Sequence, residues 1–274
     1  MAAQTVISPQ TRLLKLNWKE LWMFRDLFYL LALRDIKVRY KQTAIGVLWA
    51  FLQPVVTMVI FTIFFGNLSH VPSDNIPYPL FVYLGLLFWN FYSQALTNAS
   101  TSLVTNEQIV KKIYFPRLIM PAASMFVSMV DFLIAAVIFV GLMVYYQFVP
   151  GWSGVVLFPI LALLTYGAAL GFGLFLAAVN VKYRDVRYAL PFLIQTLLFV
   201  TPVIYSTSIV SPEHQWILYL NPMSGIIENA RFTIFNSGAI NWMSLAISAL
   251  VSLVWLVIGL FYFRRTERYF ADVL

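Results

Sequence analysis

Few side chains in this chain have the types and spacing needed for chemistry of their own. The two histidines, His70 and His214, stand far apart without a nearby acid pair, and no cysteine offers a thiolate nucleophile or a thiolate zinc site. His70 and Asp74 share a stretch with proline, which is too sparse for a metal site. The phosphate-binding pattern G-x-x-x-x-G-K-[ST] is absent, and no glycine precedes a lysine. We therefore expect no catalytic residue, metal or bound cofactor in this chain.

Asp131 is the only acid inside a long apolar run. It lies about 20 Å along a helix from Arg117 at 1.5 Å per residue. A carboxylate inside a membrane is a functional candidate by default. No second embedded acid, histidine or lysine supplies a chain for protons, so we favour a structural role in which Asp131 bonds a serine or threonine or stays protonated. The alternative is an ion-coupled carrier or channel that uses Asp131.

Glu228 and Arg231 form a second charged pair, three positions apart in an otherwise apolar region. Residues at this spacing are neighbours on a helix. We expect a local ion pair between them. The sharper hypothesis is an outer gate, in which Arg231 meets anionic lipid or substrate.

The positions of the basic residues indicate membrane topology. All of the 18 lysines and arginines except Arg231 fall in the N-terminal segment, in the stretches 111–117 and 182–187, or in the C-terminal tail. Because cytoplasmic loops collect positive charge, this pattern predicts a multi-pass membrane protein with both termini in the cytoplasm. The 61% hydrophobic and 11% charged content agrees, since soluble domains carry roughly 25% charged residues. The net charge of +7 is dispersed over loop ends, which favours contact with anionic lipid and excludes nucleic acid as a partner.

Six stretches are long and apolar enough to cross the hydrocarbon, which takes about 20 residues. The predicted fold is therefore all-α, with spans at about 44–66, 78–104, 118–148, 153–181, 188–205 and 242–263. Six crossings return the C-terminus to the cytoplasm, the side where Arg264, Arg265 and Arg268 belong. Gly167 and Gly171 give the fourth span a spacing of small residues that suits helix packing.

Two further regions predict helices that do not span. Residues 16–33 mix tryptophan and phenylalanine with charges, which is typical of an amphipathic helix in the cytoplasmic interface. We assign residues 1–43 to a cytoplasmic N-terminal segment and 44–274 to the transmembrane domain.

Between spans five and six, 216–220 and 226–235 are apolar but short, and Asn221-Pro222 separates them. We expect a pair of short re-entrant helices on the outer side.

The inner half of the second span is unusually polar for a membrane helix. Such side chains should face protein or water and not lipid, which favours a path or a dimer seam. They are Gln94, Thr97, Asn98, Ser100, Thr101, Ser102 and Thr105.

Five motifs in order along the chain resemble the ABC-2 type permeases that export polysaccharides. They are RDIKVRYKQTAIGVLWAFLQP at 34–54, NEQIVKKIYFP at 106–116, NVKYRDVR at 180–187, TPVIY at 201–205 and LNPM at 220–223. In pattern the chain is most similar to O-antigen and teichoic-acid exporters. The resemblance implies a homodimeric channel in the bacterial inner membrane, paired with two ATP-binding subunits that hold ATP and Mg. Its implied substrate is a lipid-linked polysaccharide on a polyprenyl diphosphate carrier.

The resemblance also implies a coupling helix at 106–114 that touches the ATP-binding subunits. Its charged face is exposed, while Ile109, Val110, Ile113 and Tyr114 would dock into the partner. Without the resemblance, a solvated loop with topogenic charge is the alternative. The predicted contact residues are Asn106, Glu107, Gln108, Lys111, Lys112 and Tyr114, with Arg184 and Asp185 as a second contact.

Two further residue sets are predicted to meet the substrate. Aromatic faces pack well on sugar rings, although a lipid-interface belt is the alternative for each aromatic residue. The path candidates are Phe88, Trp89, Phe91, Tyr92 and Tyr205. By resemblance, a basic set receives the lipid diphosphate, although topology alone explains its charge; it comprises Arg34, Lys37, Arg39 and Lys41.

The sequence thus predicts a non-enzymatic permease subunit of an ATP-driven exporter of O-antigen type polysaccharide. A teichoic-acid, capsule-polymer, lipid or drug exporter of the same superfamily is the alternative. A secondary transporter is less favoured because no internal repeat is visible.

Overall fold

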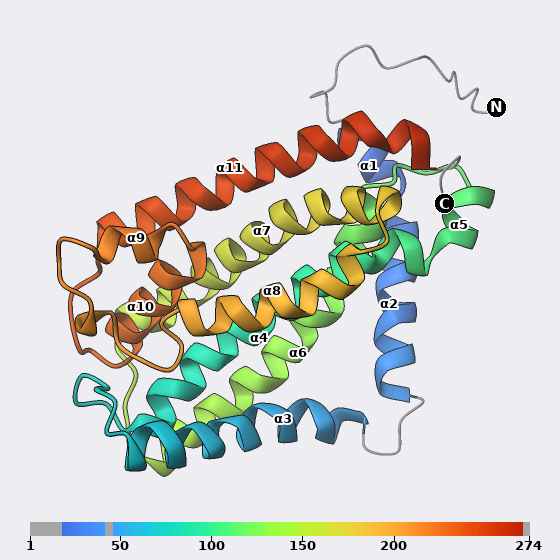
Figure 1. Cartoon of the computed structure of the whole chain (residues 1–274). Helices are drawn as coiled ribbons and strands as arrows, with labels where there is room; N and C mark the ends of the chain where they lie inside the picture. Colours follow the sequence, from blue (N-terminus) through green and yellow to red (C-terminus); the bar gives the residue numbers. More distant parts are fainter. Residues whose placement is uncertain (1–17, 42–45, 271–274) are drawn as a thin grey trace.

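The computed structural model describes residues 18–41 and 46–270, with side chains described from Leu52 onward in the second range (Figure 1). Within these ranges every regular element is helical, which confirms the all-α prediction. The elements are α1 (Trp18–Met23), α2 (Arg25–Lys41), α3 (Gly46–Phe61), η1 (Thr62–Leu68), α4 (Tyr78–Thr105), α5 (Glu107–Lys112), α6 (Ile119–Tyr145), α7 (Trp152–Lys182), α8 (Val186–Val200), η2 (Thr207–Ile209), α9 (Gln215–Tyr219), α10 (Pro222–Ile234), α11 (Trp242–Thr266) and η3 (Glu267–Tyr269).

Helices occur at each of the six predicted spans. In the described ranges α6, α7 and α11 are long and apolar enough to cross a membrane, so the protein is a multi-pass membrane protein. The crossing of α3, α4 and α8 stays a prediction. The fifth predicted span runs to residue 205, whereas α8 ends at Val200 because Thr201 precedes a proline and adopts an extended conformation.

The core of the bundle forms around α4. This helix packs along α6 and α7, while α11 lies along the other side of α7 (Figure 1). Phe81, Tyr83, Phe88 and Leu96 of α4 are completely buried there. A central helix that is buried on most of its surface has one open side at most, and that side carries the candidate site.

The two ends of the bundle differ. At one end, the α10 end, α9 and α10 are the two short helices predicted around Asn221-Pro222, and they are confirmed (Figure 1). Asn221 caps α10 by accepting the N–H of Met223 at 3.1 Å, and Pro222 occupies the first turn. Their depth in the membrane stays a prediction. At the other end, the α5 end, α5 and the first helices cover the bundle.

At the α5 end, α2 runs across the long direction of the bundle (Figure 1). Helices occur where the amphipathic helix was predicted, but they differ in extent: α1 is followed by α2, which continues to Lys41. Their amphipathic character and their place in the cytoplasmic interface stay a prediction. Leu31 and Ala32 are buried against the bundle, whereas Trp18 and Trp22 remain exposed. Exposed tryptophan beside charge suits the boundary between lipid and water. Residues 16 and 17 of the prediction lie outside the described residues.

Glycine allows α7 and α11 to approach each other closely. A Cβ atom on Gly259 of α11 would overlap the carbonyl oxygen of Gly171 of α7. Gly171 is one of the two glycines singled out in the fourth span, and the packing confirms its role. Gly167, the other one, has nothing within 4 Å of its Cβ position. Small residues drive helix association in membranes because they let backbones touch.

We predict that Gly259→Val separates α7 from α11 and destabilises the protein. Overpacking of a helix interface costs about 1–3 kcal/mol, so the apparent melting temperature in detergent should fall by several degrees. Intrinsic fluorescence during heating measures it. Gly167→Ala is the matched control and should melt as wild type does or slightly higher; equal melting of wild type and Gly259→Val would refute the packing argument.

Candidate functional site

The open side of α4 is polar. Between Leu80 and Leu103, every α4 residue is buried except five that are partly exposed, and all five are polar. They are Asn90, Gln94, Thr97, Asn98 and Thr101, which we call the polar stripe. Their spacing of three and four residues places them on one face of the helix.

Hydrogen bonds within the protein satisfy only part of this stripe. Thr97 and Thr101 donate to carbonyls of their own helix at 2.8 and 2.9 Å, and Asn98 donates to the hydroxyl of Ser128 on α6 at 2.9 Å. The partly exposed amide and hydroxyl groups have no hydrogen-bond partners in lipid. The stripe therefore has to face protein or water.

The sequence predicted that the polar side chains in this half of α4 face protein or water and not lipid. Ser100 and Ser102, two of that set, face protein, because they are buried in the bundle. Both hydroxyls donate to carbonyls one turn back on α4, at 2.9 and 2.7 Å. A path or a dimer seam stays a prediction for the set. Asn90 belongs to the stripe but was not in the predicted polar set. Asn90 lies four residues before Gln94, which places both side chains on the same face of the helix, and this spacing could have identified it from the sequence.

Asp131 joins α6 to α2 near this stripe. Its Oδ2 atom lies 2.7 Å from Nη2 of Arg39, and the hydroxyl of Tyr40 donates to its Oδ1 atom. The expected serine or threonine partner is wrong, because α2 supplies a tyrosine hydroxyl and a cation instead. The protonation state of Asp131 stays a prediction. A buried carboxylate is very unfavourable unless it is paired and hydrogen-bonded. The basic residues just before the first span were the feature of the sequence that could have indicated a cationic partner for Asp131.

Arg39 also touches the polar stripe. Its Nη2 atom donates to Oε1 of Gln94 at 2.7 Å. Arg34, from the same predicted diphosphate set, bonds Asp35 and also donates to Oδ1 of Asn106 at 2.7 Å. Lys37 and Lys41 are exposed. Carboxylates thus already partner Arg34 and Arg39, and a diphosphate site made of all four residues stays a prediction.

The predicted coupling helix exists as α5, with Asn106 just before it. Lys111, Lys112 and Tyr114 are exposed, as a contact with another protein requires. Val110 is 3% exposed and packs into this chain's own core, so its predicted docking into a partner is wrong. Glu107 and Gln108, of the same predicted set, lie on α5, and Gln108 is exposed.

The second predicted contact lies in the turn between α7 and α8. Arg184 and Asp185 are exposed there, at the same end of the bundle as α5 (Figure 1). This placement allows one partner to reach both segments. Contact with that partner stays a prediction for both sets.

At the α10 end, Arg231 is enclosed by carbonyl groups. Its guanidinium donates to the carbonyls of Pro202 and Val203 at 2.7 Å and of Phe81 at 3.2 Å, and it lies 3.4 Å from the centroid of the Phe81 ring. Gly85 makes room, because a Cβ there would lie 2.7 Å from Nη2. Burial lowers the pKa of Arg231 to about 9, so the group stays a cation at neutral pH.

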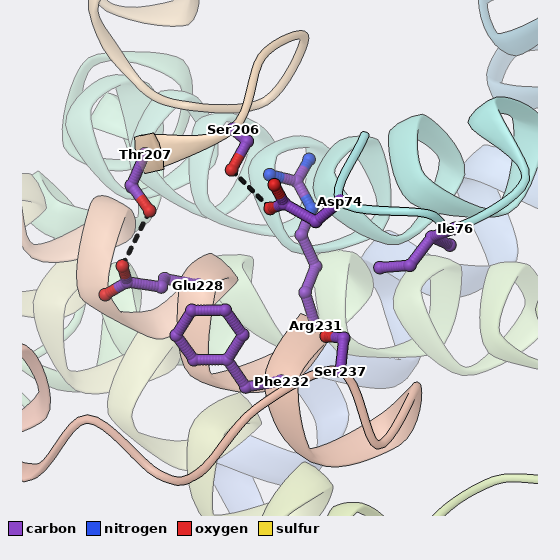
Figure 2. A pocket seen from close by; sticks show the side chains of 8 residues that line it. All are labelled: Asp74, Ile76, Ser206, Thr207, Glu228, Arg231, Phe232 and Ser237. Carbon is purple, nitrogen blue, oxygen red and sulfur yellow. Dashed lines mark hydrogen bonds between the residues drawn. The ribbon is translucent and has the colours of Figure 1, made fainter. Parts of the chain in front are cut away.

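Glu228 and Arg231 do not form the expected ion pair. Glu228 accepts from the hydroxyl of Thr207 at 2.7 Å and from that of Tyr219 at 3.1 Å. Figure 2 shows the two side chains leaving α10 in different directions, Glu228 toward Thr207 and Arg231 toward Asp74. The spacing in the sequence was informative, but it could not show that backbone carbonyls outcompete the carboxylate for the guanidinium.

A small cavity separates these groups, with room for about one water molecule. Asp74 borders it and accepts hydrogen bonds from Ser206 and, at 3.0 Å, from Ser208 (Figure 2). These hydrogen bonds, with the one between Thr207 and Glu228, join three parts of the chain: the loop before α4, the segment that follows α8, and helix α10. A role of Glu228 and Arg231 as an outer gate stays a prediction.

The predicted aromatic path residues of α4 lie in the core. Phe91 packs on Phe132 of α6 with 4.7 Å between ring centroids, and Phe88 packs on Phe158 of α7 at 5.4 Å. Trp89 and Tyr92 are also buried. These four rings hold α4 against its neighbours and do not belong to its open side.

Tyr205 is half-buried, and its hydroxyl donates to the carbonyl of Val200 at 2.8 Å. This bond fastens the segment after α8 to the last turn of that helix. Contact of Tyr205 or of the four α4 rings with substrate stays a prediction.

A comparison with family models identifies the fold. The model described as ABC-2 type transporter matches residues 26–235, which include α10 and nearly all of α2. This chain belongs to the ABC-2 type transporter family. The match covers the polar stripe, Arg39, Asp131, α5 and Arg231, and it confirms the resemblance drawn from the motifs.

Individual relatives are similar over nearly their whole length. The O-antigen export system permease protein RfbA of Klebsiella pneumoniae is 26% identical over 261 residues, which cover 95% of this chain and 99% of that protein. RfbA of Myxococcus xanthus is 29% identical over 254 residues, with 91% and 96% covered. The polysialic acid transport protein KpsM of Escherichia coli is 24% identical over 245 residues, with 86% and 92% covered.

We predict that Arg231→Met strongly destabilises this ABC-2 protein. The substitution leaves buried carbonyls without a donor, at about 1–3 kcal/mol for each unsatisfied group. The fraction of folded protein after heating in detergent, measured by size-exclusion chromatography, should fall sharply. Arg265→Met, at an exposed position, is the control. An Arg231→Met variant as stable as this control would show that the carbonyl cage adds nothing to stability.

Proposed function

We propose that this chain is the membrane-spanning permease subunit of an ATP-driven exporter of O-antigen type polysaccharide. The polar stripe is the observation that carries the proposal. Amide and hydroxyl groups along one face of a membrane helix suit a chain of sugar hydroxyls in water. The names of the RfbA relatives support this substrate class.

A second copy of the chain completes the path. The stripe is a single open face, so one subunit supplies only one wall, and a facing copy in a homodimer supplies the other. Six spans in each subunit place the stripe inside the membrane. Phe88, Trp89, Phe91, Tyr92 and Tyr205 remain candidates for contact with substrate in a state in which the core opens.

The α5 end faces the cytoplasm in this proposal. Lysines and arginines of the described residues gather there, on α2, α5, the turn between α7 and α8 and the end of α11, whereas the α10 end holds the single buried Arg231. Positive charge marks the cytoplasmic side of an inner membrane. Both termini then lie in the cytoplasm, and Glu228 and Arg231 lie near the exit.

ATP is hydrolysed by two partner subunits, which hold ATP and Mg. The exposed part of α5 provides their contact, and the exposed turn at Arg184 and Asp185 provides a second one. Closure of the partners on ATP moves α5 and reshapes the path. The carrier is a polyprenyl diphosphate that meets the basic set at Arg34, Lys37, Arg39 and Lys41.

The KpsM relative favours a second candidate, a capsule polymer of the polysialic acid kind. Teichoic acid, lipid or drug export are more distant alternatives. Complementation of strains that each lack one export permease separates these substrates, because only the matching strain regains surface polymer.

We predict that Lys111→Glu with Lys112→Glu abolishes both ATP hydrolysis and export. Reversing two exposed charges on α5 should repel the acidic groups that receive the lysines, while the bundle keeps its fold. The measurement is ATP hydrolysis by material that co-purifies with the tagged chain, alongside surface polymer in the same cells.

Arg25→Glu on α2 is the matched control, since this side chain is exposed too, and it should keep both activities. Export that survives the double substitution would contradict the assigned contact. A wild-type chain that purifies without any ATP hydrolysis would contradict ATP-driven transport itself.

A further inference from the structure

Arg39 joins three helices at the polar stripe, and the transport role proposed above does not by itself explain why. We propose that the Arg39–Asp131 ion pair is a latch that holds α2 against α6 beside the stripe, and that a phosphate group on the substrate opens it by binding Arg39. This inference rests on the proposed function for the identity of the substrate. It assigns Asp131 as a positioning residue for Arg39.

The geometry makes Arg39 a bridge. One atom, Nη2, lies 2.7 Å both from Oδ2 of Asp131 on α6 and from Oε1 of Gln94 on α4. The next residue, Tyr40, donates to the other oxygen of the same carboxylate. Consecutive residues of α2 therefore hold both oxygens of Asp131. Movement of α2 away from the stripe has to break this arrangement.

The burial of the two partners is unequal. The side chain of Asp131 is 11% exposed, whereas that of Arg39 is 39% exposed. An acid about 18 Å from the start of α6, at 1.5 Å per residue, needs a cation for its own stability. The cation keeps an accessible side on the stripe. Arg231 offers no such accessible side, because it is only 4% exposed and backbone carbonyls enclose its guanidinium.

A phosphate group can compete strongly with the carboxylate of Asp131 for the guanidinium of Arg39. Guanidinium binds carboxylate and phosphate through the same paired N–H geometry, and a diphosphate brings two negative charges against the single charge of a carboxylate. A neutral sugar chain lacks such a group. The latch therefore distinguishes a phosphate-bearing carrier from a neutral lipid or free glycan.

The same helix reaches the coupling segment. Arg34, about 7.5 Å earlier along α2 by helical rise, donates to Oδ1 of Asn106, the residue just before α5. Thus α2 is bonded to the entry of α5 at one point and to the stripe at another. Release of Arg39 and movement of α5 are mechanically connected through this helix.

The absence of cysteine from the sequence gives a direct test. A single Thr97→Cys substitution on the stripe reports access of a water-soluble maleimide in phosphatidylcholine nanodiscs that hold the chain with its co-purified partners. With the latch intact, Thr97 is only partly exposed, so labelling should be slower than after release of Arg39. Asp131→Asn in the same background should accelerate it about tenfold, because the amide keeps the shape of the carboxylate but lacks its charge.

Polyprenyl diphosphate added to the nanodiscs should accelerate labelling in the Thr97→Cys protein and add little in the Asp131→Asn variant. Polyprenol, which lacks phosphate, should leave both rates unchanged. Arg25→Gln is the control, since it removes an exposed cation from the same helix and should label slowly.

Two results overturn the latch. One is equal labelling with and without Asp131→Asn in proteins of matched melting temperature, and the other is equal acceleration by polyprenol and polyprenyl diphosphate. If Asp131→Asn does not fold, Arg39→Gln in the Thr97→Cys background takes its place: it too should label about tenfold faster, and slow labelling would overturn the latch.

The exchanged pair Arg39→Asp with Asp131→Arg is a further check, because it should restore slow labelling.

Failure of the latch is distinguishable from failure of the proposed function. A wild-type complex that exports polymer but shows no change in labelling refutes only the latch. A chain without partners and without export refutes the function, while the labelling of Asp131→Asn still tests the latch.

Discussion

The structure depends on one constraint, that a polar group surrounded by hydrocarbon must find a partner or water. The α4 helix shows it most clearly, since between Leu80 and Leu103 its apolar residues are buried and its partly exposed positions are all polar. Lipid is an unsuitable neighbour for that face. The transport path in our account follows from this mismatch between one helix face and the membrane.

The same constraint gives two arginines opposite roles. Arg231 is enclosed by backbone carbonyls and helps to hold the α10 end together. Arg39 is paired with a buried acid but keeps part of its guanidinium exposed on the polar stripe. Because backbone carbonyls already accept the N–H groups of Arg231, that cation has a structural role. Because the ion pair of Arg39 leaves part of its guanidinium exposed, a substrate can compete for that cation.

The sequence predicted the helices, because hydrophobic length and basic clusters are local signals, and it predicted α5 and the pair α9 and α10 from their proline and asparagine boundaries. It did not predict partners that lie far apart in the chain. Asp131 was assigned to a serine or threonine on a neighbouring helix, because the sequence does not show which helix packs on α6. Glu228 was assigned to Arg231 because the two lie close together in the sequence. The burial of Phe88 and Trp89 also required knowledge of which face of α4 meets α6 and α7.

The most direct test of the central claim is to ask what touches the polar stripe during export. A photo-crosslinking amino acid placed at Thr97 in living cells should attach covalently to the polymer, giving a ladder of heavier species that antibodies to the chain and to the polysaccharide both detect. The same probe at Val137, an exposed apolar position on α6, should give no such ladder. Polymer attached at Val137 and absent at Thr97 would contradict the account.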